Sequence, residues 1–314
     1  MDPRKQFVLR GEKMKSAKRK FLGNQPFSYA VFDVLNTVFM VLISIICIYP
    51  LYYIFIYSIS DPLEAAKGLT FYPKNVTFTN FISIFNDDKI FHAMGVSLAR
   101  TVLGTVITVV CTSFMAFLFS QVKLPHKRFF NRFVVITMYF SSGLIPWYLT
   151  MTAYGLKNSF LLYIIPSAVN AYYMILIKAY LESLPPSLQE SAEIDGAGII
   201  TVFFKIVMPL SKPILATVAL FSAVGQWNTW SDNLYLVKNP SLKTLQLTLY
   251  EYFQSNAPSV ENLRDFAATM SQRTVTTTSI RMSIAVVTIV PIFLFYPFVQ
   301  KYFQKGIMIG AVKG

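Results

Sequence analysis

The sequence predicts an all-α integral membrane protein with six transmembrane helices, and three observations support this fold class. Of the 314 residues, 54% are hydrophobic and only 14% are charged, and the mean hydropathy is +0.49. A soluble domain of this length could not bury so much apolar surface. Six segments are apolar over enough residues to cross about 30 Å of hydrocarbon. Lys and Arg gather in alternate loops, as the positive-inside rule requires.

The amino-terminal tail, residues 1–30, is strongly basic and carries only Asp2 and Glu12 as acids. No small-residue cleavage signature follows it, so we expect it to be uncleaved and cytoplasmic. The excess of Lys and Arg over acids, 28 against 15, is therefore read as topology and attraction to the lipid bilayer, not as nucleic-acid binding.

The transmembrane domain is expected over residues 31–304, followed by a short tail at 305–314. Basic residues lie between the second and third spans and after the sixth span. Together with the amino-terminal tail, they place both termini in the cytoplasm. The predicted spans are approximately 33–58, 94–120, 130–152, 160–181, 207–228 and 280–301.

A polar segment, 185–213, separates two of these spans on the cytoplasmic side. Pro185 and Pro186 end the preceding helix, and Ser187 with Glu190 matches a capping box, so a short helix is expected from Ser187. Glycines at 196 and 198 should stop it, and a second helix should follow from about residue 200. The segment is thus predicted to be a helix, a glycine elbow and a second helix.

Seven residues of this segment match a known motif at its spacing. They are Glu190, Ala192, Asp195, Gly196, Ala197, Phe203 and Pro209. The segment resembles the EAA loop of ABC-importer permeases, with Ser191 in place of the usual first alanine. The resemblance implies the type I ABC importer permease fold, in which this loop is a coupling helix seated in a cleft of a separate ATPase. It also implies that Glu190 pairs with an ATPase arginine. An ordinary amphipathic loop helix is the alternative.

The carboxyl-terminal tail ends in Gly-Ala-Val-Lys-Gly and resembles the ending of a maltose-class permease subunit, where the tail slides between two ATPase subunits. The residues that carry this resemblance are Gly310, Lys313 and Gly314. A frayed terminus is the alternative reading. The external loop 229–279, with a helical-looking stretch at 260–273, corresponds in that class to a loop that reaches into the substrate-binding protein.

Segments 72–81, 227–230 and 296–303 also resemble carbohydrate permeases, in particular the subgroup that imports large oligosaccharides such as polysaccharide-lyase products or host glycans. The resemblance implies a bacterial cell membrane location. It further implies three kinds of protein partner: a second homologous permease, two ATPase subunits and an extracytoplasmic solute-binding protein.

The sequence contains no phosphate-binding loop of the type G-x-x-x-x-G-K-[ST], so no cofactor is expected in this chain and a partner ATPase should bind Mg-ATP. His92 and His126 show no catalytic or metal-ligand arrangement, and no enzyme activity is predicted. Ionisable residues in the apolar spans, such as Asp33 and Arg100, are expected near span ends at interfacial depth. This weakens the alternative of an ion-coupled secondary sugar transporter. A receptor or structural membrane protein is a further alternative.

Aromatic and amide side chains inside the predicted spans suit a sugar path, because aromatic rings stack on C–H faces and amides bind hydroxyl groups. Aromatic residues also concentrate at bilayer interfaces, which is the alternative role for each of them. The candidates are Tyr139, Trp147, Tyr148, Asn170, Tyr172, Tyr173, Trp227 and Asn228.

Overall fold

The computed structural model describes residues 27–68, 71–121, 124–254, 276 and 278–294, and within these ranges the regular structure is helical, without a strand. The chain divides into two compact units, Met1–Ile56 and Tyr57–Gly314. The described part of the first unit is helix α2 (Phe27–Ile59) as far as Ile56, and its large apolar side chains between Val31 and Tyr52 are exposed. A helix that is hydrophobic on all sides matches a membrane span.

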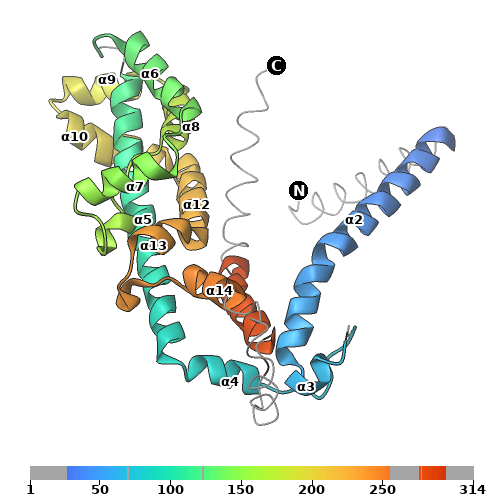
Figure 1. Cartoon of the computed structure of the whole chain (residues 1–314). Helices are drawn as coiled ribbons and strands as arrows, with labels where there is room; N and C mark the ends of the chain where they lie inside the picture. Colours follow the sequence, from blue (N-terminus) through green and yellow to red (C-terminus); the bar gives the residue numbers. More distant parts are fainter. Residues whose placement is uncertain (1–26, 69–70, 122–123, 255–275, 277, 295–314) are drawn as a thin grey trace, which may run out of the picture. The chain divides into compact units, whose positions relative to one another are not determined.

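The second unit is organised around α5 (Asp88–Ser120), which packs against α8 (Ala171–Leu181) and α12 (Lys212–Asn228) (Figure 1). Small and hydroxyl residues of α5, among them Gly104, Thr108 and Ala116, are buried. They allow neighbouring backbones to approach closely, as small residues do in membrane helices.

Each predicted span overlaps helical structure, but three of the six are interrupted. Two described helices are long and apolar enough to cross a membrane as single helices. The first is Val31–Ile59, which is part of α2, and the second is α5. Two bent pairs raise this number to as many as four. Shorter apolar helices at Ala171–Leu181 and Thr278–Leu294 match the fourth and sixth predicted spans, and residues 295–301 of the sixth lie outside the described residues.

The predicted span 130–152 is interrupted by a sharp bend. This segment forms α6 (Lys127–Tyr139) and α7 (Leu144–Ala153), whose axes differ by 116°. The backbone leaves the helix at Phe140, which is extended, and Gly143 has a φ of +77°, a value that glycine adopts at low cost.

The predicted span 160–181 is also interrupted. It begins as a 3₁₀ turn, η1 (Phe160–Tyr163), and becomes an α-helix only at α8. Between them, the backbone carbonyls of Ser167 and Ala168 accept hydrogen bonds from Thr108 and Thr112 of α5, at 2.8 and 3.2 Å. Non-helical backbone at membrane depth is stable when neighbouring groups satisfy it in this way.

The segment between α8 and α12 folds into four short elements. They are α9 (Ser187–Ile194), α10 (Ile199–Val202), the π-helical turn η2 (Phe203–Val207) and α11 (Met208–Leu210). The chain then bends by 85° into α12. The fifth predicted span, 207–228, therefore contains a sharp bend near its start.

Five further short elements lie elsewhere in the described chain. They are α3 (Pro62–Ala65), α4 (Thr79–Phe85), α13 (Ser231–Leu236), η3 (Pro240–Leu242) and α14 (Leu245–Gln254). The predicted external loop 229–279 is thus ordered over its first half, where Leu236, Leu245 and Leu247 are almost fully buried. Its stretch 260–273 lies outside the described residues.

Candidate functional site

Helix α9 begins where the sequence predicts, but the predicted capping box does not form. Pro186 occupies the cap position, no side chain caps the helix, and the amide of Glu190 donates to the carbonyl of Pro186 at 3.1 Å. Ser187 is already inside the helix, so its hydroxyl is not placed to cap it. The φ of −59° at Pro186 instead starts the helix, because proline is pre-set for the first turn.

The glycine elbow is confirmed at Gly196, whose φ is +80°. The amide of Gly196 donates to the carbonyl of Glu193 at 3.1 Å, and the amide of Ala197 donates to the carbonyl of Ala192 at 2.9 Å. These bonds close the end of α9. A Cβ at Gly196 would meet no atom within 4 Å, so the position requires glycine for its backbone conformation and not for space.

Phe203 anchors the second arm of the segment to α5. It is 1% exposed, and its ring centroid lies 5.1 Å from that of Phe114 and 5.6 Å from that of Phe117. Ala192, on α9, is buried beside the same cluster. These two residues of the motif therefore hold the loop on the helix bundle.

The opposite surface of the segment is open to solvent and combines acidic and apolar side chains. Glu190, Asp195 and Pro209 are exposed, as is Gly196. Large apolar side chains are exposed beside them, and Ile194 is exposed to 86%. The others are Leu188 and Ile200. A solvent-exposed apolar surface around an acidic group suits docking of a protein with a basic residue.

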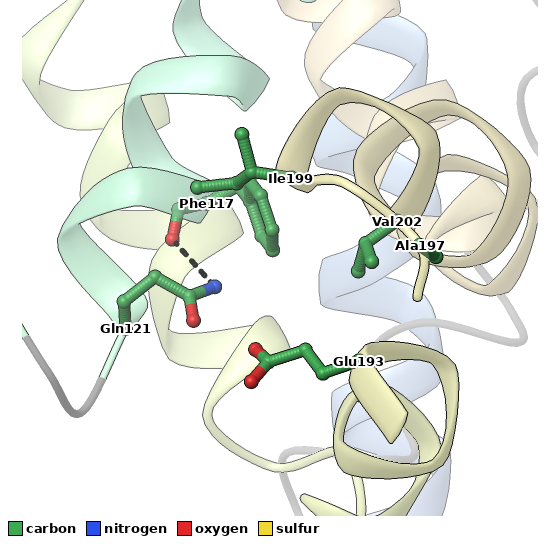
Figure 2. Close-up of a pocket in the computed structure, with 6 residues that line it drawn as sticks. All are labelled: Phe117, Gln121, Glu193, Ala197, Ile199 and Val202. Carbon is green, nitrogen blue, oxygen red and sulfur yellow. Dashed lines mark hydrogen bonds between the residues drawn. The ribbon is translucent and has the colours of Figure 1, made fainter. Parts of the chain in front are cut away.

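The segment and the end of α5 line an open cavity of about 240 Å³ (Figure 2). Its lining residues are Phe117, Gln121, Glu193, Ala197, Ile199 and Val202. The amide of Gln121 donates to the carbonyl of Phe117 at 3.4 Å and to the side-chain carbonyl of Gln189 at 3.1 Å. This second bond joins α9 directly to the end of α5, while the cavity leaves the rest of the junction loosely filled.

Glu182, just after α8, connects two helices at this end of the bundle. Its carboxylate lies 3.1 Å from the ammonium groups of both Lys127, at the start of α6, and Lys178. Partial burial raises the pKa of Glu182, but hydrogen bonds and charge attraction from the two lysines outweigh this effect, and its pKa is lowered overall.

Comparison with known proteins decides the family. No family model matches the chain. The chain is 36% identical to Protein LplC of Bacillus subtilis (strain 168), over 90% of this chain and 95% of that protein. It is 33% identical to the polygalacturonan/rhamnogalacturonan transport system permease protein YtcP of the same strain, over 90% of this chain and 99% of that protein. The chain belongs to the family of ABC sugar-transporter permeases.

Solved structures agree with this assignment. The permease resembles a chain in the crystal structure of a bacterial ABC transporter involved in the import of the acidic polysaccharide alginate, with a TM-score of 0.82 and 28% identity. The match covers 89% of this permease and 99% of that chain. The predicted all-α ABC importer permease fold is therefore confirmed. The permease is a transport subunit and not an enzyme, and the family assignment argues against the ion-coupled carrier and the receptor.

The candidate path residues of the permease do not form one lining. Trp147 and Tyr148 pack against a cluster around Tyr163, whereas Tyr173 packs against the Phe203 cluster and Trp227 belongs to a third cluster. Several support the fold directly. The side chain of Asn170 caps α8, the indole of Trp227 donates to the carbonyl of Thr288 at 3.0 Å, Tyr148 accepts from Lys157 at 2.9 Å, and Asn228 accepts from Gln246 at 3.1 Å. Tyr139 and Tyr172 are exposed. A role in the sugar path stays a prediction for each of these residues. The tail residues predicted to contact the ATPases, Gly310, Lys313 and Gly314, lie outside the described residues.

The permease also contains a buried ion pair that sequence reasoning missed. Arg100 of α5, expected at interfacial depth, is 3% exposed and binds Asp232 of α13 through two hydrogen bonds, at 3.0 and 2.5 Å. An arginine within an apolar helix usually finds an internal partner, which was the signal available in the sequence. The partner, 132 positions away, could not be chosen from the sequence.

Proposed function

We propose that this permease and a second homologous permease form the translocation path for an oligosaccharide. An extracytoplasmic solute-binding protein delivers the sugar, and two ATPase subunits that bind Mg-ATP drive its passage. The protein lies in the bacterial cell membrane with both termini in the cytoplasm. The exposed acidic and apolar surface of α9 is the observation that carries this proposal, because it is firmly attached to the bundle and open on its outer side.

The coupling step follows from that attachment. When the ATPases close, they push on α9 through Glu190 and its apolar neighbours. The motion passes into the bundle through Phe203, which packs on α5, and through the bond between Gln121 and Gln189. Rigid packed elements transmit such displacements because packed cores switch between discrete arrangements instead of deforming continuously. The tail at 305–314 contributes a second ATPase contact in this proposal.

The names of the relatives favour an acidic oligosaccharide as substrate. One relative is a polygalacturonan/rhamnogalacturonan permease, and the solved importer acts on the acidic polysaccharide alginate. Neutral oligosaccharides are the second candidate, because other relatives are named for arabinooligosaccharides and for melibiose, raffinose and stachyose. Uptake of each class into proteoliposomes, competed by the other class, separates the two.

The proposal is tested by mild-detergent purification of the tagged permease, identification of its partners and an ATPase assay on the eluate. We expect a second permease and an ATPase in the eluate, and hydrolysis that a sugar-loaded binding protein stimulates. Glu190→Ala should lower transport about tenfold or more while the protein still inserts into the membrane.

The matched control for that variant is Glu193→Ala, which removes the same charge from the cavity side of the same helix. It should keep transport near the wild-type rate. Loss of membrane insertion in Glu190→Ala, or equal losses in both variants, would count against a specific coupling role. A permease that purifies alone and inert would overturn the proposed function itself.

A further inference from the structure

Arg100 occupies a binding site that several elements of the fold build around it. In addition to its two bonds to Asp232, its Nε donates to the side-chain carbonyl of Gln226 on α12 at 3.0 Å. One terminal nitrogen also donates to the carbonyl of Thr229 at 3.1 Å. The guanidinium lies 4.5 Å from the centre of the Tyr163 ring, on η1. One side chain of α5 therefore holds α12, α13 and η1 together.

The surrounding residues are shaped to keep this arrangement. A Cβ at Gly104, one turn further along α5, would lie 2.7 Å from the amide group of Gln226, so only glycine admits that side chain. Gln226 in turn donates to the hydroxyl of Ser167 at 2.6 Å. Every described partner of Arg100 is thus itself positioned, and the polar groups in this buried network are satisfied.

The external segment, defined here as residues 229–254, is fastened to the same face of α5. The hydroxyl of Ser97 accepts a hydrogen bond from the amide of Leu245, at the start of α14, at 2.8 Å. Asn233 hydrogen-bonds to the hydroxyl of Tyr163 and donates to the carbonyl of Leu242 at 3.1 Å. Arg100 and Ser97, one turn apart on α5, therefore fix the start of the external segment and the start of α14.

A buried ion pair is a poor source of stability, because removing two charges from solvent offsets most of their attraction. In some proteins a buried polar pair instead fixes the position of the elements that it joins. In this permease the joined elements lie toward the amino-terminal end of α5. Gln121 follows the opposite end of the helix and binds Gln189 of the segment 185–213, here called the coupling loop. A helix rises about 1.5 Å per residue, so these two attachments lie about 30 Å apart along one rigid element.

We propose that Arg100 and Asp232 make α5 a rigid link that transmits docking of the solute-binding protein on the external segment to the coupling loop. This inference rests on the proposed function, because it needs a binding protein and an ATPase at the two ends. Arg100 is a positioning residue in this role. It contacts neither sugar nor ATP, and it keeps the external segment and α5 moving together.

The test uses the complete importer in proteoliposomes: this permease, its partner permease, the ATPases and the binding protein loaded with sugar. Asp232→Asn removes the charge and keeps the shape. We expect the maximal stimulation of ATPase activity by the binding protein to fall about tenfold. Basal hydrolysis should stay within about twofold of wild type, since ATP binding does not depend on the link.

Two further variants separate a link from a merely structural role. Arg100→Lys keeps the charge but loses the two-pronged bond, and it should show the same selective loss in a milder form. The matched control pairs Lys67→Met with Glu64→Leu, which removes a more exposed ion pair at 2.5 Å outside the external segment. This control should leave the stimulation unchanged.

Wild-type stimulation in Asp232→Asn would overturn the inference. A proportional fall of basal and stimulated hydrolysis in both Asp232→Asn and Arg100→Lys would overturn it as well, because that pattern indicates general damage to the fold. If the wild-type importer itself does not respond to any binding protein, the proposed function fails first, and this outcome is distinct from the other two.

Discussion

The ring of Phe203 lies edge-on to the ring of Phe114, with centroids 5.1 Å apart and planes at 75°. This contact joins the coupling loop to the central helix α5 through a side chain that is only 1% exposed. It explains why the motif includes a large aromatic residue beside the small buried Ala192. The docking surface moves with the bundle only if such an anchor exists.

We expect Phe203→Ala to destabilise the permease by about 3 kcal/mol, because a large buried aromatic side chain is replaced by a cavity. Phe204→Ala is the matched control, since Phe204 is its neighbour but is 52% exposed. Thermal unfolding in detergent should show a clearly lower midpoint for the first variant and a small change for the second. Equal midpoints would refute the anchor.

Gly196→Ala should strain the elbow by about 1 kcal/mol or more, because alanine resists a φ of +80°. Gly198→Ala is the control, with a φ of −69° and no atom within 4 Å of the added Cβ. Transport coupled to ATP hydrolysis should fall in Gly196→Ala and persist in Gly198→Ala. The elbow interpretation is wrong if the two variants transport equally well.

Gly104→Ala should displace Gln226, because the added Cβ would lie 2.7 Å from its amide group. The expected cost is about 1 to 3 kcal/mol, typical of an overpacked core. Gly95→Ala on the same helix meets no atom within 4 Å and should be neutral or stabilising by up to about 1 kcal/mol, since alanine favours helix. Unfolding midpoints of the two variants give the comparison, and a stabilised Gly104→Ala would contradict the close approach.

The carboxylate of Glu182 should make stability depend on acidic pH. Burial by itself would raise the pKa of this carboxylate, but Lys127 and Lys178 lower it in the folded state, and the lysines outweigh the burial. The stabilisation is therefore complete above the unfolded-state pKa of about 4.3 and is lost as the pH falls through the lower folded-state pKa. The contribution is small, because the side chain is 38% exposed.

Unfolding midpoints of wild type and Glu182→Gln between about pH 3 and pH 7 measure this dependence. We expect a constant difference above about pH 5 that vanishes at the acidic end. In the Glu182→Gln background, Lys178→Met should add little further loss, since its ion-pair partner is already gone. A difference that grows on acidification would reverse the assigned sign.

The amino-acid sequence by itself determined the helical membrane class, the approximate positions of the apolar helices and the start and end of α9. These features depend on local chemistry: apolar runs of membrane length, prolines that start α9 and a glycine that ends it. At the start of α9, the local sequence pattern predicted the wrong cap. Ser187 and Glu190 have capping-box spacing, yet Pro186 takes the cap position, so the hydroxyl has no free amide to bind.

Only the tertiary structure decided where spans break and which buried polar groups meet. The carbonyls of Ser167 and Ala168 can leave a helix because Thr108 and Thr112 on another helix supply hydrogen bonds. Arg100 can be buried because Asp232, far away in the chain, neutralises it. The ordered external segment follows from the same bonds. Such partners are selected by proximity in three dimensions, and the free energy of satisfying a buried polar group overrides local preference.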